Sequence, residues 1–451
     1  MKTSPSEKEN NNQSSSPSSQ NITEIPAIPI IRLTTPNDRK RKRTPQSIPR
    51  SATKRTKRSS DDPDLVQETR RQIFEDFGEN VEAALVEEML DFYDDFPDLI
   101  EEYRLVNKIG EGTFSSVYKA VDINHNAYDN EAWDRTGLSH VGSSGRKNQH
   151  FVAIKRIYVT SSPSRIHNEL NILHRLSGHP NIIPIITARR RNDQVIAILP
   201  YFEHDDFRTY YRHMTILQIR QYMRSLLSAL AHVHAEKIIH RDVKPSNFLY
   251  DPELGTGVLV DFGLAQDEPP ALKKDAGKPP VGTKGINLEK AGKGGGKRIG
   301  YVVNDPRPSA RANRAGTRGF RAPEVLFKVS HQTCSIDVWS AGVILLSLFS
   351  GQFPFFQSTD DGEALLEIAC MFGKEAMQRV ASRFKRTFET NIPDVGEQRS
   401  FEDICRKLYP RKAGEVPRAG WDLLRRLMAL EPEERIGAKE AMKHEFFEGM
   451  G

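Results

Sequence analysis

The chain has few cysteines and no long apolar run. Its 451 residues include only three cysteines, Cys334, Cys370 and Cys405, and these form neither a close pair nor a metal-ligand spacing. A disulfide framework or zinc site is therefore not expected. The longest apolar stretch, "SAGVILLSLFSG" at 340–351, is too short to span a bilayer and predicts a buried core helix. The N-terminus has no apolar signal segment, so we expect no membrane association.

Acidic residues are missing from one segment of the N-terminal tail. Residues 1–60 are poor in apolar side chains and rich in Ser, Asn and Pro, which predicts disorder. Within them, residues 39–58 hold ten Lys or Arg and no acid. Two basic clusters with a short spacer indicate a nuclear import signal. Weak, non-specific contact of this tail with nucleic acid is the alternative, and both interpretations favour the nucleus.

The sign of the charge reverses in residues 61–102, which hold sixteen Asp or Glu against two Arg. Val81, Leu85, Met89 and Phe92 recur at helical spacing and share one face. This pattern predicts an acidic helical extension that docks on the following domain. An electrostatic contact between the extension and the basic tail is the other interpretation.

Glycines interrupt an alternating pattern from Tyr103 onward, in "YRLVNKIGEGTFSSVYKAV". The pattern predicts two antiparallel strands joined by a tight turn. Glycines in such a turn let the backbone approach phosphate groups, because no Cβ intrudes. Ser115 stands where a third glycine is commoner, and this motif alone is a weak signal.

Further along, the strand "FVAIKRI" carries Lys155 and the helical pattern "IHNELNILHRLSGHPNII" carries Glu169. Together the two side chains can form the ion pair that directs an ammonium at the phosphates of ATP. In "IIHRDVKPSNFLYDPELGTGVLVDFGLAQ", Asp242 suits a catalytic base and Lys244 a positive charge for the transferred phosphate. Asn247 and Asp261 supply oxygen ligands for Mg²⁺.

The order of these motifs, followed by "RAPE", "DVWSAG" and a late Arg, resembles the eukaryotic protein kinases over residues 103–448. The resemblance implies an α+β, bilobal fold: an N-lobe (103–199) of antiparallel sheet plus one helix, a hinge (200–206), and a mostly helical C-lobe (207–448). It also implies an ATP site with Leu199 behind the adenine. The residues that it assigns to this site are Ile109, Gly110, Glu111, Gly112, Thr113, Phe114, Ser115, Ser116, Val117, Ala153, Lys155, Pro200, Phe202 and Asp206.

The same resemblance implies three structural contacts. Glu324 of "RAPE" is expected to pair with Arg435, and Asp337 of "DVWSAG" to hold the backbone of the catalytic loop. Thr317 is expected to bond near Asp242 and Lys244, as in serine/threonine kinases.

Residues 267–315 form a low-complexity insert in the activation segment, rich in Gly, Pro and Lys. Together with "GTRGFRAPEVL" and "QTCSIDVWSAGVILLSLFSG", this insert resembles the catalytic subunit of DDK, the cell-division-cycle-seven kinase of replication origins. The resemblance implies Mg-ATP, a regulatory activator subunit, and acidic Ser/Thr sites on the MCM helicase as substrates. The activator would supply order that the Glu169 helix and the long segment lack.

Several alternatives stay open. Arg311, Arg314, Arg318 and Arg321 bind acidic substrates in one interpretation, whereas in the other Arg321 is structural and Arg311 and Arg314 belong to the insert. The chain is alternatively another nuclear serine/threonine kinase, casein-kinase-like or cyclin-dependent-like, or a pseudokinase scaffold. The purposes of the hydrophilic excursion at 122–150 and of Ser246, where some kinases place an acid, are not assigned.

Overall fold

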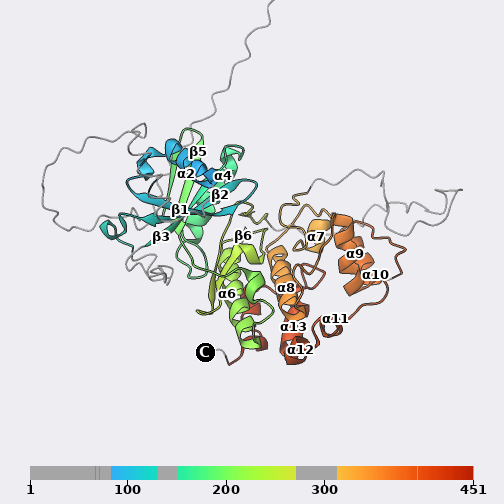
Figure 1. Ribbon diagram of the computed structural model, residues 1–451. Helices are drawn as coiled ribbons and strands as arrows, with labels where there is room; N and C mark the ends of the chain where they lie inside the picture. The colour runs from blue at the N-terminus through green and yellow to red at the C-terminus, as the bar shows by residue number, and fades with distance from the viewer. Residues whose placement is uncertain are drawn as a thin grey trace, which may run out of the picture. The chain divides into compact units, whose positions relative to one another are not determined.

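The computed structural model describes residues 67, 71, 83–130, 150–270, 312–393 and 395–449, all of which belong to the unit Lys40–Gly451. The predicted import signal, Val81, Arg311 and most of the activation-segment insert lie outside the described residues. Figure 1 shows the arrangement of the elements.

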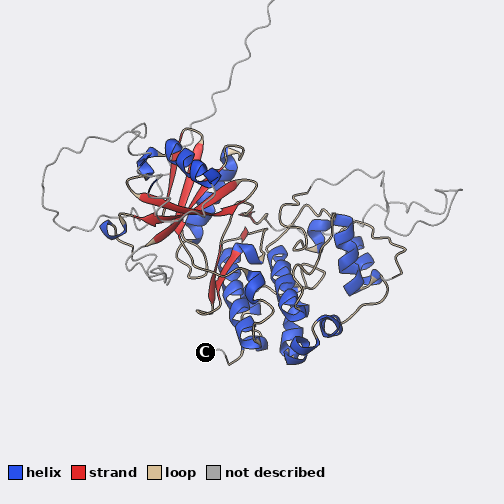
Figure 2. Cartoon of the chain, viewed as in Figure 1, coloured by secondary structure: helices blue, strands red, loops and turns tan. Residues whose placement is uncertain are grey.

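The N-lobe contains a five-stranded antiparallel sheet with the strand order β1-β2-β3-β5-β4 (Figure 2). Its strands are β1 (Tyr103–Glu111), β2 (Ser115–Asp122), β3 (Phe151–Ile157), β4 (Thr187–Arg191) and β5 (Gln194–Pro200). The predicted turn closes where Gly112 N donates to Ser115 O at 2.9 Å. A short 3-10 helix, η3 (His125–Ala127), follows β2.

Two helices cover the two faces of this sheet. The helix α4 (Pro163–Leu176) begins at Ser162, which accepts a hydrogen bond from Arg165 N, and it packs with Ile157 and Ala197 in one apolar cluster. On the other face, α2 (Ala83–Asp95) and the short η2 (Pro97–Leu99) pack with Tyr118 and Ile154 in a second cluster. Successive strand residues point to opposite faces, which explains why the neighbours Ile196 and Ala197 of β5 belong to different clusters.

Two of the side chains that the sequence placed on one face of an N-terminal helix are fully buried. Met89 and Phe92 of α2 are fully buried against the sheet, and Leu85 packs at the edge of the same cluster. The described part of the acidic extension is therefore a docked amphipathic helix, the first of the two interpretations.

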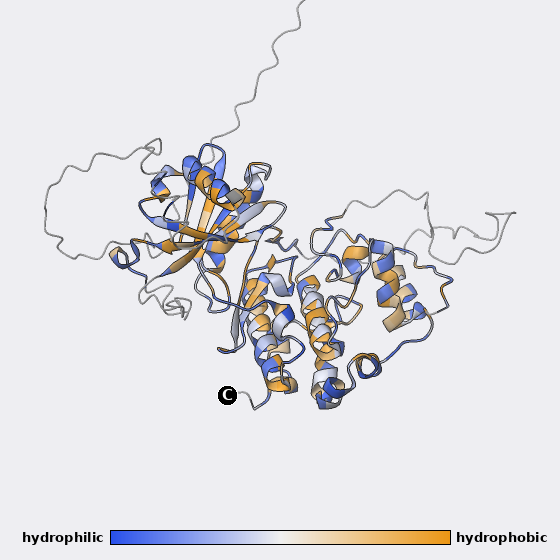
Figure 3. Ribbon diagram, viewed as in Figure 1, coloured by the Kyte–Doolittle hydropathy of each residue, from blue (hydrophilic) through white to orange (hydrophobic). Residues whose placement is uncertain are grey.

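The C-lobe is mostly helical and is built around α8 (Ser335–Ser350), the helix predicted from the longest apolar stretch. Every residue of α8 after Ser335 is buried, and the helix is among the most hydrophobic segments in Figure 3. It ends at Gly351, whose φ of 65° suits a residue without a Cβ. Gly342 lets α13 (Arg418–Leu427) pack closely, because a Cβ there would lie 2.5 Å from Met428.

The other C-lobe elements surround this core. The helix α6 (Ile216–Ala235) starts with a reciprocal cap between Thr215 and Gln218. The remaining helices are α5 (Phe207–Tyr210), α7 (Pro323–Leu326), α9 (Asp361–Phe372), α10 (Lys374–Arg383), α11 (Phe401–Leu408), α12 (Pro410–Glu415), α14 (Ala438–Ala441), η4 (Pro245–Asn247) and η6 (Glu445–Phe447). The short strands are β6 (Ile238–Ile239), β7 (Phe248–Asp251), β8 (Thr256–Leu259) and β9 (Gln266–Asp267).

These elements form the α+β, two-lobed fold that the sequence predicts. Within the described ranges, no helix combines the length and apolar character needed to cross a membrane. The three cysteines have free thiols.

Candidate active site

Lys155 of β3 lies at the centre of a buried ion-pair cluster. Its Nζ is 2.6 Å from Glu169 Oε1 of α4 and 2.8 Å from Asp261 Oδ1. Burial alone would lower the pKa of Lys155, but the charges of Glu169 and Asp261 raise it above its ordinary value. The predicted Lys155–Glu169 pair is present, and it holds the ammonium protonated and fixed in direction.

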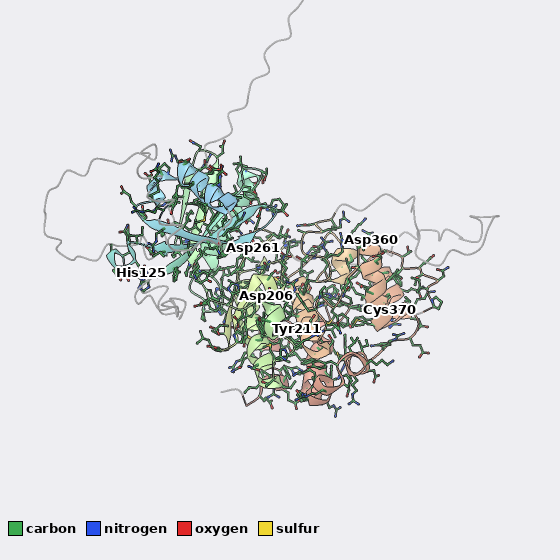
Figure 4. The ribbon with its side chains drawn as sticks, in the orientation of Figure 1. His125, Asp206, Tyr211, Asp261, Asp360 and Cys370 are labelled. Atoms are coloured by element: carbon green, nitrogen blue, oxygen red, sulfur yellow. The ribbon has the colours of Figure 1, made fainter. Side chains whose placement is uncertain are left out.

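Asp261, labelled in Figure 4, carries an ionised carboxylate that is about half exposed. Burial would raise its pKa, yet the charge of Lys155 and its hydrogen bond outweigh this and lower the pKa to about 2. The side chain is 47% exposed, so a cation can reach the oxygen that Lys155 does not hold. Its backbone has a φ of 61°, a left-handed conformation that Asp adopts more readily than most residues.

A two-stranded hairpin brings Asn247 next to Asp261. In this hairpin Phe248 of β7 pairs with Leu259 of β8, and Val260 N donates to Asn247 O at 2.9 Å. Asn247 Nδ2 donates to the backbone oxygen of Asp242 at 2.9 Å and to its Oδ2 at 3.0 Å. The amide oxygen is then the atom of Asn247 that remains to coordinate a cation.

A carboxylate and an amide oxygen at this position fit Mg²⁺, which binds to hard oxygen donors and often keeps few protein ligands. In the part of the chain that the structure describes, no group of three or more His, Cys, Asp or Glu side chains is placed to hold a metal ion. A cation at Asn247 and Asp261 would thus need further oxygen ligands from phosphates or water.

Asp242 has hydrogen-bond partners on both carboxylate oxygens. Its Oδ1 accepts from Thr317 N at 2.8 Å and from Thr317 Oγ1 at 2.6 Å. Its Oδ2 lies 2.9 Å from Lys244 Nζ, which also donates to Thr317 Oγ1 at 2.9 Å. The predicted contacts of Thr317 are present, and they fix the orientation of a buried carboxylate.

The loop that carries Asp242 is anchored to α8 by a second buried carboxylate. Asp337 accepts from His240 N and Arg241 N, both at 2.8 Å, and its Oδ2 is 3.0 Å from His234 Nε2. Burial would raise the pKa of Asp337, but these hydrogen bonds and the nearby His234 lower it. Asp337 therefore stays ionised and holds the loop backbone, as predicted.

The predicted pair of Glu324 and Arg435 is also present. Two hydrogen bonds join the guanidinium to the carboxylate, at 2.8 and 3.2 Å, and Arg435 Nη1 also donates to Ser335 O at 2.8 Å. Both side chains are buried, so each charge depends on the other for its compensation.

Most of the residues predicted to contact the nucleotide lie around the glycine turn between β1 and β2. Val117 pairs with Lys155 across β2 and β3, and Ala153 lies two residues from Lys155 on the same face. The turn residues Gly110, Glu111, Gly112, Thr113, Phe114 and Ser115 lie next to this face or at its edge, and Ile109 is 42% exposed beside them.

The side chains of two predicted residues, Ser116 and Phe202, point elsewhere. Ser116 is buried on the face that α2 covers, where it bonds to Tyr118, so only its backbone can meet a nucleotide. Phe202 is buried in the apolar cluster that also contains α4, again leaving only its backbone at the hinge. Asp206 accepts from Arg208 N at the start of α5. Pro200 ends β5, opposite Val152.

Three of the four predicted substrate arginines are described, and all have internal partners. Arg314 and Arg321 pair with Asp361 at 2.8 and 3.0 Å, and Arg318 bonds to Thr359 O. Arg321 also donates twice to Gly316 O, which fits a structural role. Arg314 remains half exposed despite its pair.

The sequence reasoning did not identify two residues on α4. Asn168 Nδ2 donates to Ala265 O at 2.8 Å, and Arg165 Nε donates to Gly263 O at 2.9 Å. Arg165 lies one helical turn before both Asn168 and Glu169, at spacings of three and four residues, and this spacing was the available signal.

Comparison with known proteins identifies the same architecture. The family model "Protein kinase domain" matches residues 139–284 and 300–447. The glycine turn lies before the matched segments, so its assignment depends on the strands and contacts described above.

The chain is also similar to several curated proteins. It is 44% identical over 373 residues to the cell cycle serine/threonine-protein kinase hsk1 of Schizosaccharomyces pombe, covering 78% of this chain and 73% of that protein. It is 40% identical to the cell cycle protein kinase spo4 of the same organism, over 79% of this chain and 87% of that one. A probable cell division control protein 7 homolog of Encephalitozoon cuniculi is 41% identical, over 78% and 93%.

Proposed function

Because the chain belongs to the protein kinase family and, within it, to the Cdc7-type cell-cycle serine/threonine kinases, we propose that it phosphorylates acidic Ser/Thr sites on replication proteins in the nucleus. Protein kinase domains in general use ATP with Mg²⁺. The observation that carries the proposal is the convergence of Lys155, Glu169 and Asp261, beside an Asp242 whose two oxygens are both held.

In this proposal each residue has a role that its contacts support. Lys155 binds the α- and β-phosphates of ATP, and Glu169 orients it. Asp242 orients the substrate hydroxyl and accepts its proton as the oxygen bonds to the γ-phosphorus, while the bond from this phosphorus to the bridging oxygen breaks and ADP leaves. Lys244 stabilises negative charge on the transferred phosphoryl group. Asn247 and Asp261 would hold Mg²⁺, which neutralises phosphate charge when it is bound.

The proposed substrates are acidic sites such as those on the N-terminal tails of the MCM helicase. Arg314 and Arg318 are exposed and lie next to Thr317, which contacts Asp242. Cationic side chains at this place favour a phosphoacceptor that is followed by acidic residues. Their pairing with the α9 region means that a substrate has to compete with Asp361 for Arg314.

We further propose that a regulatory activator subunit holds the arrangement in which Lys155 meets Glu169. A partner that binds this arrangement preferentially shifts the population toward it. The basic residues 39–58 are proposed to direct nuclear import, with weak nucleic-acid contact as a further role of the same tail.

The test begins with the full chain purified from its native cells together with its copurifying subunits. We expect this assembly to transfer phosphate to acidic Ser peptides, and to transfer far less to peptides in which the acids are changed to Ala. Asp242→Asn should lower kcat by about 10²–10⁴-fold, because the proton acceptor is lost. Thr317→Ala should lower kcat less, and Thr317→Ser should restore it.

Absence of transfer by the assembly, or an Asp242→Asn variant with full activity, would contradict the proposed function. Equal transfer to acidic and neutral peptides would contradict the proposed substrate class alone. A full chain with Gln at the basic positions of 39–58 that still reaches the nucleus would contradict the import role.

A further inference from the structure

Arg165, in the first turn of α4, contacts two elements that are distant from it along the chain. Its guanidinium carbon lies 3.8 Å from the centre of the Phe114 ring, in the glycine turn. Its Nε donates to Gly263 O at 2.9 Å, two residues after Asp261. Neither contact belongs to the ion pairs around Lys155.

The contact with Phe114 fixes the tip of the glycine turn. Phe114 is 41% exposed, and its ring has no place in either apolar cluster. A guanidinium stacked over an aromatic face attracts it electrostatically. The backbone oxygen of Phe114 also accepts from Tyr158 N at 2.9 Å, so the tip is tied to the connection between β3 and α4.

The contact with Gly263 fixes the start of the activation segment. Asn168 Nδ2 adds a second hydrogen bond one turn along, to Ala265 O at 2.8 Å. Space at Gly263 is tight, because a Cβ there would lie 3.2 Å from both Asp261 Oδ1 and Glu169 Oε2. A shift of Gly263 would therefore displace the carboxylates that surround Lys155.

The two contacts use different parts of one guanidinium. Its carbon lies over the ring while its Nε donates to the carbonyl oxygen, so both contacts exist at the same time. A guanidinium already oriented by Gly263 loses less conformational freedom when it stacks on Phe114, and the reverse holds equally. Each contact therefore strengthens the other.

We propose that Arg165 is a positioning residue that couples closure of the glycine turn over the nucleotide to the seating of α4 and of the segment after Asp261. The inference rests on the proposed use of Mg-ATP at this site. It assigns to Phe114, predicted as a nucleotide contact, a role in holding the turn closed through Arg165.

The test is a double-mutant cycle in the purified assembly, with Arg165→Gln, Phe114→Leu and both together. Each single variant should raise KM for ATP about two- to fivefold, the size expected for a half-exposed cation–π contact. Arg165→Gln should also lower kcat, because its contact with Gly263 is weakened, whereas Phe114→Leu, which keeps that contact, should lower kcat less. The double variant should raise KM no more than Arg165→Gln alone.

Arg175 provides a matched control on the same helix. It pairs with Asp267 at 2.7 Å and donates to Glu236 O at 2.9 Å, so it contacts the segment and not the glycine turn. Arg175→Gln should leave KM for ATP unchanged.

A second readout is independent of catalysis. Amide hydrogen exchange of residues 110–116 should slow when Mg-ATP binds to the full chain, and Arg165→Gln should lose this protection whereas Arg175→Gln keeps it. The coupling would be overturned if the double variant raised KM for ATP by the product of the two single effects. Full protection of the amides of residues 110–116 in Arg165→Gln would overturn it as well. A parent chain that binds no Mg-ATP at all would instead overturn the proposed function.

Discussion

His179 is a residue at which folding changes proton affinity. Its ring stacks on His232 with centroids 4.7 Å apart, and its Nδ1 accepts from Asn181 N at 3.2 Å. Burial, together with the charge of His232, lowers the pKa of His179 from its ordinary value of 6.5 to about 4. A ring whose Nδ1 is an acceptor has to be neutral at that nitrogen, so the hydrogen bond agrees with this direction.

The consequence is a loss of stability in mild acid. Between pH 6.5 and 4 the unfolded chain binds a proton at His179 and the folded chain does not, so the free energy of unfolding falls as the pH falls. From pH 7 to 5 we expect this ring to contribute a loss of about 1 kcal/mol, reduced for its partial exposure.

Urea unfolding of the parent and of His179→Gln at both pH values checks this. The variant should lose less stability between pH 7 and 5 than the parent does. His167→Gln, which changes an exposed histidine on α4, is the control and should leave the difference as in the parent. Equal losses in the parent and in His179→Gln would refute the assignment.

At this scale the sequence predicted the residues of the site better than their surroundings. Lys155, Glu169, Asp242 and Asp261 are identifiable because charged side chains recur in a fixed order within apolar segments. The position of Ser116 was missed because a single residue of register decides which face of β2 a side chain occupies.

The helix α2 shows how one element supports the site from outside it. Glu88 of α2 bonds to Lys108 of β1 at 2.9 Å and to Tyr118 Oη of β2 at 2.5 Å. These two strands flank the glycine turn. The ring of Phe92 packs at a tilt against that of Tyr118, with centroids 5.1 Å apart. The helix therefore joins both strands that carry the turn.

Removing the apolar part of this contact should destabilise the N-lobe. Because Phe92 is fully buried, we expect Phe92→Ala to lower the free energy of unfolding by about 3–5 kcal/mol. Asp91→Ala, on the exposed side of the same helix, should change it little. Urea unfolding of the full chain measures both free energies. An effect of Phe92→Ala as small as that of Asp91→Ala would show that α2 is not an integral part of the lobe.

The face of α2 was predictable and its partners were not. Helical spacing alone places Met89 and Phe92 together. The contacts of Glu88 depend on the register between β1 and β2, which is irregular at two places between Leu105 and Gly110. No sequence pattern specifies such irregularities.

At the scale of the whole molecule, the two described ends of the activation-segment insert meet adjacent residues. Pro270 O lies 3.1 Å from His331 Nε2, and Gln332 Nε2 donates to Asn313 O at 2.9 Å. The insert thus leaves and re-enters the C-lobe at one place. Its length places little demand on the fold, since each halving of a closed loop changes the closure free energy by only about 0.6 kcal/mol.

We therefore expect a short Gly/Ser linker in place of residues 271–311 to preserve folding. Urea unfolding should give a midpoint close to that of the parent. A linker that also replaces Glu268, which accepts from Cys334 N at 2.9 Å, is the control and should destabilise the chain. Unfolding of the first variant under conditions where the parent is folded would contradict this expectation.

Long-range pairs such as Glu324 with Arg435 could be predicted only through the family resemblance. The two residues are 111 positions apart in the sequence, and their spacing obeys no local period. Their mutual compensation depends on the three-dimensional packing of α7 and α8, which composition and periodicity do not encode.

The hairpin of β7 and β8 also affects how the sequence can vary. Asn247 comes just before β7 and Asp261 just after β8, so both lie at the open end of the hairpin. The turn at 252–255 closes the opposite end. Because the ladder between the strands sets the separation of the two ligands, residues can be inserted at or deleted from the closed end without altering the spacing of the cation site. Related sequences should therefore differ in the number of residues at that turn, but should have no insertion between Val260 and Asp261.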